Sequence, residues 1–183
     1  MKVITTPLAG VLVLEPRVFK DDRGYFVETY QLERYKEAGI TQPFVQDNSS
    51  HSIKGTLRGM HFQEPRGQGK LVACTRGVIW DAVIDIRKGS PTFGKWFGVE
   101  LSAETARQIW VPVGFAHGFC VLSETADVTY KCTDFYAPGT ERSIIWNDPD
   151  VGIQWPVDKP LLSPKDAAAP KLKDAPVLPG GPR

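Results

Sequence analysis

The chain contains three histidines, and one of them, His61, has neighbours that suit acid–base chemistry. Arg58 stands three residues before His61, with Gly59 between them, in a strand-like stretch. Strict alternation along a strand would place Arg58 and His61 on opposite faces, whereas one β-bulge at Gly59 would bring both side chains to the same face. Because histidine titrates near neutral pH, it can remove and return protons, and the pattern favours a site here.

A second histidine, His117, lies in residues 112–119, whose Pro-x-Gly-x-x-His spacing resembles the second motif of the cupin superfamily. The first cupin motif normally supplies His-x-His and a glutamate to a metal. Here the corresponding stretch is His61-Phe62-Gln63, so one imidazole is missing. Two separated histidines and an amide fall short of the usual metal-ligand sets. We therefore expect a site without a metal and without any other cofactor.

Short apolar segments separated by glycine and proline must position these residues. Their patterns predict strands over residues 10–16, 24–30, 44–49, 56–63, 71–75, 78–87, 95–101, 108–112, 118–122, 126–135 and 143–146. One short helix is expected over 31–38, where Leu32 and Tyr35 stand three residues apart and Gly39 suits the C-terminal stop. Many short strands with few helices predict an all-β sandwich or barrel.

The clearest strand pattern, over residues 78–87, carries two carboxylates on one face. Asp81 and Asp85 alternate there with Ile79 and Val83. Such a face either points into a half-polar interior or faces solvent, and the pattern leaves both open. From about residue 150 the periodicity stops, and we expect the last dozen residues to form an extended or disordered tail.

Composition restricts the setting of the protein. The formal net charge is +1, so bulk electrostatics point to neither a nucleic-acid partner nor a membrane partner. No signal-peptide pattern is visible, and no apolar run approaches the roughly 20 residues of a membrane-spanning helix. The three cysteines, Cys74, Cys120 and Cys132, are widely separated and predict buried free thiols. We expect a cytoplasmic protein.

Motifs that follow one another along most of the chain resemble the dTDP-4-dehydrorhamnose 3,5-epimerases. They lie in residues 19–28, 44–50, 57–63, 69–72, 85–94, 112–119, 130–136, 146–149 and 163–166. The resemblance implies an all-β double-stranded β-helix, that is, a jelly-roll or cupin-like barrel, with a few short helices. We expect this epimerase domain to span 1–167, with a Pro-rich C-terminal tail over 168–183.

The resemblance also implies an activity and an assembly. The substrate would be dTDP-4-keto-6-deoxy-glucose, epimerised at C3 and C5 to give dTDP-4-keto-rhamnose. The protein would be a homodimer in which N-terminal strands reach across to the neighbouring subunit and lend residues to its site. The enzyme would be a cofactor-independent isomerase.

Individual residues match positions with roles in the family. The resemblance implies that His61 is the general base, Tyr130 the proton donor and Asp166 the acid that pairs with the base. It places Lys70 near the 4-keto oxygen. Two residues match the lining of the sugar and phosphate pocket: Arg58 and His117. The residues that match the nucleotide side are Arg23, Glu28, Gln46, Asn48, Tyr136, Glu141 and Lys165. As the partner of His61, Asp85 remains an alternative to Asp166.

Epimerisation beside a ketone needs residues of these types. The proton to be removed is acidic only when the enolate oxygen is stabilised, which the Lys70 ammonium can do. A carboxylate behind an imidazole fixes its tautomer and stabilises its protonated form. A tyrosine hydroxyl on the opposite face can return a proton and so invert the carbon. Arginine and lysine suit the two phosphates, and Tyr136 matches the aromatic residue that stacks on thymine.

The sequence leaves several alternatives open. Relatives with the same residues invert one carbon or two, and they serve rhamnose or other deoxysugar pathways. A sugar-nucleotide-binding cupin without catalysis and a metal-dependent cupin oxygenase are the competing classes. The presence of both His61 and Tyr130 argues against the first, and the missing His-x-His argues against the second.

Overall fold

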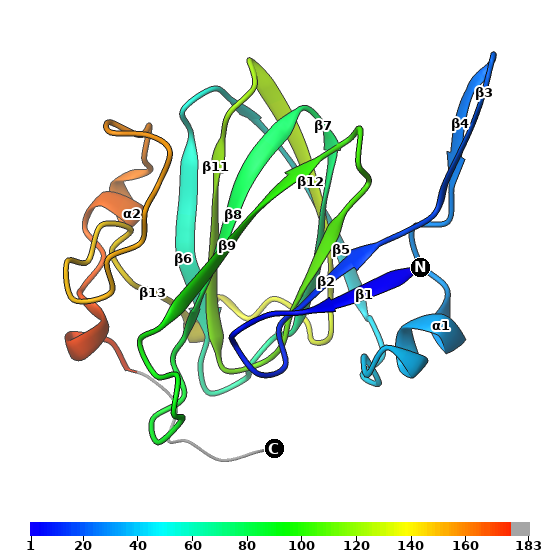
Figure 1. Ribbon diagram of the computed structural model, residues 1–183. Helices are drawn as coiled ribbons and strands as arrows, with labels where there is room; N and C mark the ends of the chain where they lie inside the picture. Colours follow the sequence, from blue (N-terminus) through cyan, green and yellow to red (C-terminus); the bar gives the residue numbers. More distant parts are fainter. Residues whose placement is uncertain (177–183) are drawn as a thin grey trace.

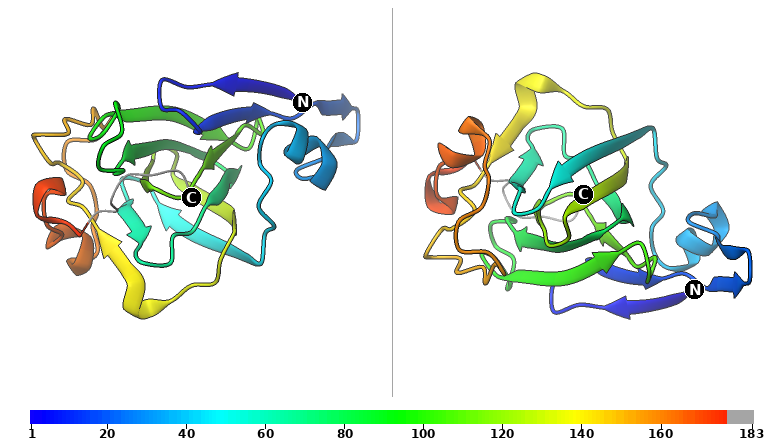
Figure 2. Two further views of the ribbon diagram at one scale, coloured as in Figure 1. Left: turned by 90° about the horizontal axis from the view of Figure 1, so that it is seen from below. Right: turned by 90° about the horizontal axis from the view of Figure 1, so that it is seen from above.

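Two β-sheets face each other across a common interior in the computed structural model, which describes residues 1–176 (Figures 1 and 2). The first sheet contains, in spatial order, β1 (Lys2–Thr5), β2 (Leu12–Glu15), β10 (Gln108–Val111), β7 (Lys70–Arg76), β12 (Thr125–Cys132) and β5 (Gln46–Ile53). The second contains β13 (Glu141–Ser143), β6 (Leu57–Gln63), β11 (Phe115–Val121), β8 (Val78–Asp85) and β9 (Trp96–Ser102). All neighbouring strands are antiparallel. This arrangement confirms the predicted all-β jelly-roll barrel.

Outside the barrel, a two-stranded hairpin stands apart from both sheets (Figure 1). It consists of β3 (Val18–Asp21) and β4 (Gly24–Val27). The helices are short: α1 (Leu32–Glu37), α2 (Pro164–Ala167) and the 3-10 turns η1 (Pro138–Thr140) and η2 (Leu172–Asp174). The predicted helix over 31–38 is confirmed as α1, and Gly39 follows it with a positive φ of 93°.

Most of the predicted strands are present, with shifted ends. The strand expected over 118–122 begins at Phe115, so His117 lies inside β11. The strand expected over 143–146 lies earlier, as β13. Strands β1 and β3 were not predicted, because their side chains are mostly exposed and carry no apolar alternation.

The barrel interior is apolar at its centre and contains one buried acid from β8. Ile79 and Val83 belong to the cluster of buried side chains between the two sheets. Asp81, which shares their face, is 0% exposed. The face with the carboxylates therefore points into a half-polar interior, which was one of the two alternatives for this strand.

Beyond the barrel, the segment that follows β13 covers the outer face of the second sheet. Leu172 and Ala175 are buried in a cluster with Met60 of β6 and Ile84 of β8. The Leu172 N–H donates a 2.7 Å hydrogen bond to a carboxylate oxygen of Asp148. The prediction of an extended or disordered tail is therefore wrong for residues 172–175, and residues 177–183 lie outside the described residues. Within residues 1–176, no helix is long and apolar enough to cross a membrane.

Candidate active site

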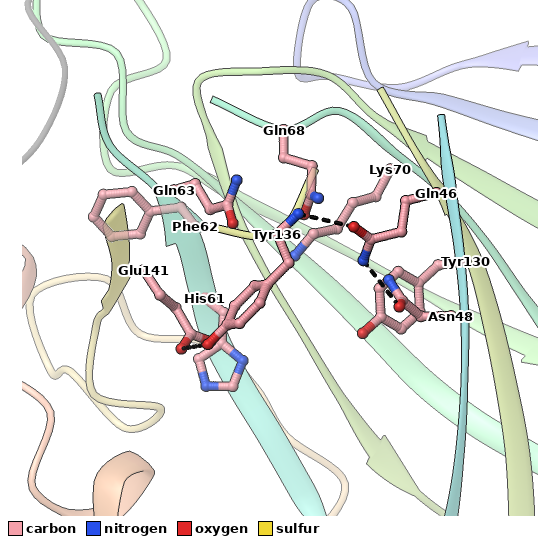
Figure 3. Close-up of a pocket in the computed structure, with 10 residues that line it drawn as sticks. All are labelled: Gln46, Asn48, His61, Phe62, Gln63, Gln68, Lys70, Tyr130, Tyr136 and Glu141. Carbon is pink, nitrogen blue, oxygen red and sulfur yellow. Dashed lines mark hydrogen bonds between the residues drawn. The ribbon is translucent and has the colours of Figure 1, made fainter. Parts of the chain in front are cut away.

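A pocket of about 190 Å³ opens where strands of the first sheet meet β6 and β13 of the second (Figure 3). Its lining comes from β5, β6, β7, β12 and β13 and from two connecting segments. The lining residues are Gln46, Asn48, His61, Phe62, Gln63, Gln68, Lys70, Tyr130, Tyr136 and Glu141. Seven of these were predicted as site residues from the sequence, which brings most of the expected chemistry into one place.

The predicted β-bulge on β6 is confirmed by the strand register. His117 and Phe119 of β11, two residues apart, pair with His61 and Arg58, which are three apart. Gly59 supplies the extra residue with a φ of +134°, a conformation that other residues rarely adopt. A Cβ at this position would lie 2.5 Å from a backbone atom of β11, so the close approach of the two strands requires glycine.

His61 is paired with the carboxylate of Asp166. The distance from His61 Nε2 to Asp166 Oδ1 is 2.5 Å. Asp166 sits in α2, whose start is capped by Ser163, because the serine Oγ accepts a hydrogen bond from the Asp166 N–H. Asp166 is only 3% exposed. Burial raises the pKa of Asp166, but the hydrogen bond and charge of His61 outweigh this, so the net pKa is lowered. The acid stays ionised behind the imidazole.

Asp85, the alternative partner, is engaged elsewhere. Its carboxylate accepts two hydrogen bonds from the Arg87 guanidinium, at 2.9 and 2.7 Å, and one each from the hydroxyls of Ser90 and Thr92. Burial raises the pKa of Asp85, but these hydrogen bonds outweigh burial and lower the pKa to about 2. Asp85 therefore organises the loop after β8, and the pairing of His61 falls to Asp166.

Tyr130 and Lys70 complete the inner part of the pocket. Figure 3 shows Tyr130 of β12 and His61 of β6 on different sides, with the Lys70 amine pointing into the space between them. The Lys70 Nζ lies 5.8 Å from the centre of the Tyr130 ring. Burial raises the pKa of Tyr130, so its hydroxyl keeps its proton. Burial lowers the pKa of Lys70, and nearby negative groups, including Glu141 and Asp81, oppose this only in part.

The outer part of the pocket carries four of the predicted nucleotide-side residues in one hydrogen-bonded chain. The Gln46 amide donates to Asn48 at 3.0 Å and accepts from the Tyr136 backbone N–H at 2.8 Å. The Tyr136 hydroxyl donates to Glu141 at 3.2 Å. Glu141 also pairs with Lys165, which lies outside the pocket lining. These residues form a polar rim around the opening.

Two predicted sugar and phosphate residues lie near the pocket without lining it. The Arg58 Nε donates to the hydroxyl of Ser52 at 3.0 Å. Burial raises the pKa of Tyr130, and the positive charge of Arg58 opposes this rise in part. His117 is buried and bonded to Asp81, with 2.8 Å between His117 Nε2 and Asp81 Oδ2. Contact of either residue with substrate stays a prediction.

Arg23 and Glu28 lie outside the pocket. Arg23 stands at the tip of the β3–β4 hairpin, with 89% of its side chain exposed, and bonds only to Asp21 among the described residues. Glu28 pairs with Arg34 of α1. Within one chain, the structure therefore does not bring these two residues to the other site residues.

No group of three or more His, Cys, Asp or Glu side chains within residues 1–176 is arranged to hold a metal ion. The facing histidines of β6 and β11 each bond to a carboxylate of their own, His61 to Asp166 and His117 to Asp81.

Sequence reasoning missed several residues that build the pocket. Phe62, Gln63 and Gln68 line it, although none was predicted as a site residue. Ser163 orients the helix that carries Asp166, and its sequence gave a usable signal: a serine directly before proline is typical of a helix start. The glutamines gave no comparable signal, because an amide in a strand or loop has no distinctive pattern.

Comparison with known proteins agrees with this geometry. A family profile described as dTDP-4-dehydrorhamnose 3,5-epimerase matches residues 5–174. The dTDP-4-dehydrorhamnose 3,5-epimerase of Shigella flexneri is 54% identical over 177 residues, which cover 96% of this chain and 98% of the relative. A dTDP-4-dehydrorhamnose 3-epimerase of Streptomyces niveus is 39% identical, with 96% of this chain and 86% of the relative covered.

A solved structure is also similar over the whole chain. It is the crystal structure of dTDP-6-deoxy-D-glucose-3,5-epimerase from Legionella pneumophila in complex with dTDP-4-keto-L-rhamnose. The match has a TM-score of 0.95 and 51% identity, and it covers 100% of this chain and 99% of the other. The chain belongs to the dTDP-4-dehydrorhamnose 3,5-epimerase family.

Proposed function

We propose that this protein epimerises dTDP-4-keto-6-deoxy-glucose at C3 and C5, giving dTDP-4-keto-rhamnose. The observation that carries the proposal is the convergence of three groups on one pocket: the His61–Asp166 pair, the protonated Tyr130 hydroxyl and the Lys70 amine. A base and an acid on different sides, with a cation between them, suit proton removal and return next to a ketone. The reaction needs no change in oxidation state.

In the proposed reaction each residue has a distinct task. His61 takes the proton from the carbon beside the ketone, and Asp166 stabilises the imidazolium that results. Lys70 stabilises the negative charge that develops on the ketone oxygen. Tyr130 then gives its proton to the opposite face of the same carbon, which inverts it. The polar rim, which includes Gln46, Tyr136 and Glu141, would bind the nucleotide together with its two phosphates. The guanidinium of Arg58 would contribute to this binding.

The proposal is tested by proton NMR of the substrate incubated with the protein in D₂O. We expect deuterium uptake and inversion at both C3 and C5. Uptake and inversion confined to C3 would favour the second candidate, a single-carbon epimerase, as in the relative from Streptomyces niveus. Absence of uptake and inversion at both carbons would contradict the epimerase proposal itself.

We propose the cytoplasm as the setting, with no nucleic-acid or membrane partner. The net charge of +1 gives no strong electrostatic attraction to nucleic acid or to an anionic membrane surface. Cys74, Cys120 and Cys132 are all buried and free, which suits a reducing compartment.

We further propose a homodimer in which the β3–β4 hairpin reaches the neighbouring subunit. The hairpin projects from the barrel and exposes large apolar side chains: Phe19 is 48%, Tyr25 61% and Phe26 68% exposed. Such a patch on a projecting arm is costly in water and suits burial against a second copy. Arg23, at the tip of the same hairpin, would then enter the partner's site.

Subunit complementation tests this sharing of sites. Arg23→Ala and His61→Ala proteins should each be nearly inactive alone. After subunit exchange, a mixed dimer has one site with an intact His61 and an intact Arg23 from the other chain. An equal mixture should therefore recover roughly a quarter of wild-type activity, because half of the dimers are mixed and each has one working site.

The matched control places both changes on one chain. Mixed dimers of wild type and the double variant should have no working site, because the intact His61 then faces an altered arm. Subunit exchange should therefore lower the activity of an equal mixture from about one half to about one quarter of wild type, whereas it raises the activity of the first mixture. No recovery in the first mixture, or a stable and active monomer by light scattering, would contradict the shared-site dimer.

The pH dependence should reflect the environment of Lys70. Burial lowers the Lys70 pKa, so as pH rises the ammonium loses its proton below its ordinary value of 10.5. We therefore expect the alkaline fall in kcat/KM to begin below pH 10.5. This fall precedes the loss of the Tyr130 proton, because the pKa of Tyr130 is raised from 10.0. Lys70→Arg should lower the rate and move this alkaline limb upward, since arginine keeps its charge.

The exposed Lys54, which pairs with Glu124, gives the matched control for this experiment. Lys54→Arg should leave the pH profile unchanged. If Lys70→Arg also left the alkaline limb in place, another group would be responsible for it.

A further inference from the structure

Tyr136 stands in a segment without regular secondary structure, between β12 and η1. Its side chain is 52% exposed at the edge of the pocket. An exposed aromatic residue in such a segment would ordinarily sample many conformations, and ordering it on binding has an entropic cost. Here, however, side chains from two strands hold the backbone on each side of Tyr136.

Gln63, at the end of β6, makes most of these contacts. Its Nε2 donates to the Phe135 carbonyl at 3.3 Å and to the Arg66 carbonyl at 3.1 Å, and its Oε1 accepts from the Ala137 N–H at 3.0 Å. The residue is only 6% exposed. Because both amide hydrogens are engaged by backbone carbonyls, Gln63 has no N–H left for a bound substrate.

Gln46, on β5 of the other sheet, holds the opposite edge of the same peptide unit. Its Oε1 accepts from the Tyr136 N–H at 2.8 Å, while Gln63 binds the Phe135 carbonyl of that unit. Since the carbonyl and the N–H of a trans peptide point in opposite directions, the two glutamines fix its orientation from both sides. Gln63 also fixes the next peptide unit through the Ala137 N–H. The backbone on either side of the Tyr136 Cα is thereby restrained.

We propose that Gln63 is a positioning residue for nucleotide recognition, because it holds Tyr136 in the orientation that receives the base. The inference rests on the proposed function, in which the polar rim that includes Tyr136 binds the nucleotide, and on the implied stacking of Tyr136 on the thymine. An already ordered aromatic residue binds more tightly than one that must be ordered on binding. Gln63 thus restrains the 135–137 segment from the position at which a cupin metal site would have an imidazole.

Replacement of Gln63 by methionine, which has a similar shape and no amide, tests this role. The dissociation constant of dTDP, measured by titration calorimetry, should rise about tenfold, and KM for the sugar nucleotide should rise with it. The kcat value should stay within about twofold, because the catalytic groups are untouched. Binding of dTDP requires no turnover, so this result is independent of whether the protein epimerises both carbons.

A double-mutant cycle with Tyr136→Ala decides whether Gln63 acts through Tyr136. In the Tyr136→Ala background, Gln63→Met should change dTDP affinity by less than about twofold, because the side chain that Gln63 positions is already absent. Effects that multiply instead would show that Gln63 acts on the nucleotide directly or through the general fold, and would overturn the proposal. A large fall in kcat in Gln63→Met would overturn it as well.

Two further variants keep the test decisive. Gln154→Met removes an exposed glutamine amide that is not part of the pocket lining and should leave dTDP affinity unchanged. If Gln63→Met does not fold, Gln63→Glu takes its place, because a carboxylate keeps the acceptor for the Ala137 N–H and loses the two donated bonds. This variant should weaken dTDP binding at least as much, since its charge faces two carbonyl oxygens. Unchanged binding in Gln63→Glu would overturn the proposal.

Discussion

Replacement of His61 by asparagine is expected to abolish both product formation and deuterium uptake next to the ketone. Without an imidazole, the site has no group to take the proton, so no enolate forms. Positioned acid–base groups contribute about 10²- to 10⁴-fold each, and loss of the base should lower the rate about 10³-fold or more. Proton NMR in D₂O measures both quantities in one sample, because uptake and inversion give separate signals.

His51 provides the matched control. It is a surface histidine paired with Asp127, and 57% of its side chain is exposed. His51→Asn should leave both uptake and inversion within about twofold of wild type. Deuterium uptake that persists in His61→Asn would identify another base, and the proposed role of His61 would then be wrong.

Replacement of Tyr130 by phenylalanine should separate exchange from inversion. The change removes the hydroxyl and keeps the ring, so its packing against the interior is retained. His61 can still take the proton and return a solvent-derived one to the same face. We therefore expect deuterium uptake to fall less than about tenfold, while inversion falls about 10²- to 10³-fold. The separation arises because the two groups act on opposite faces of one sugar ring.

Tyr30 allows a comparison that removes the same hydroxyl outside the pocket lining. Its ring packs against Tyr35 and Phe44, and Tyr30→Phe should change neither exchange nor inversion appreciably. Equal losses of exchange and inversion in Tyr130→Phe would instead show that Tyr130 holds the ground-state substrate and is not the proton donor.

Local signals in the sequence were sufficient for most of the strands and for the bulge that positions His61. Gly59, which stands between Arg58 and His61 in the strand, predicted an extra residue in β6, and the register with β11 confirms it. The alternation over 78–87 predicted β8, although it left open which side Asp81 faces. These features depend on residues close together in the chain, so periodicity and glycine positions report them.

Contacts between distant segments could not be predicted in the same way. His61 and Asp166 are 105 positions apart, and their pairing depends on the packing of α2 against β6. Gln63 and Ala137 are 74 positions apart, so no local pattern in the sequence indicated the role of this amide. Leu172 was assigned to the tail because proline and lysine surround it, whereas its burial depends on apolar side chains of other segments.

The location of Asp166 outside the barrel has a consequence for how the enzyme loses activity. The acid behind His61 belongs to a four-residue helix, α2, followed by a segment fixed by a few buried contacts such as that of Leu172. Segments of this kind open at lower free energy than the strands of a sheet, without global unfolding. Mild denaturant would therefore inactivate the protein while both sheets remain intact. Catalytic competence and barrel integrity are thus separate equilibria in this molecule, linked through the docking of its C-terminal segment.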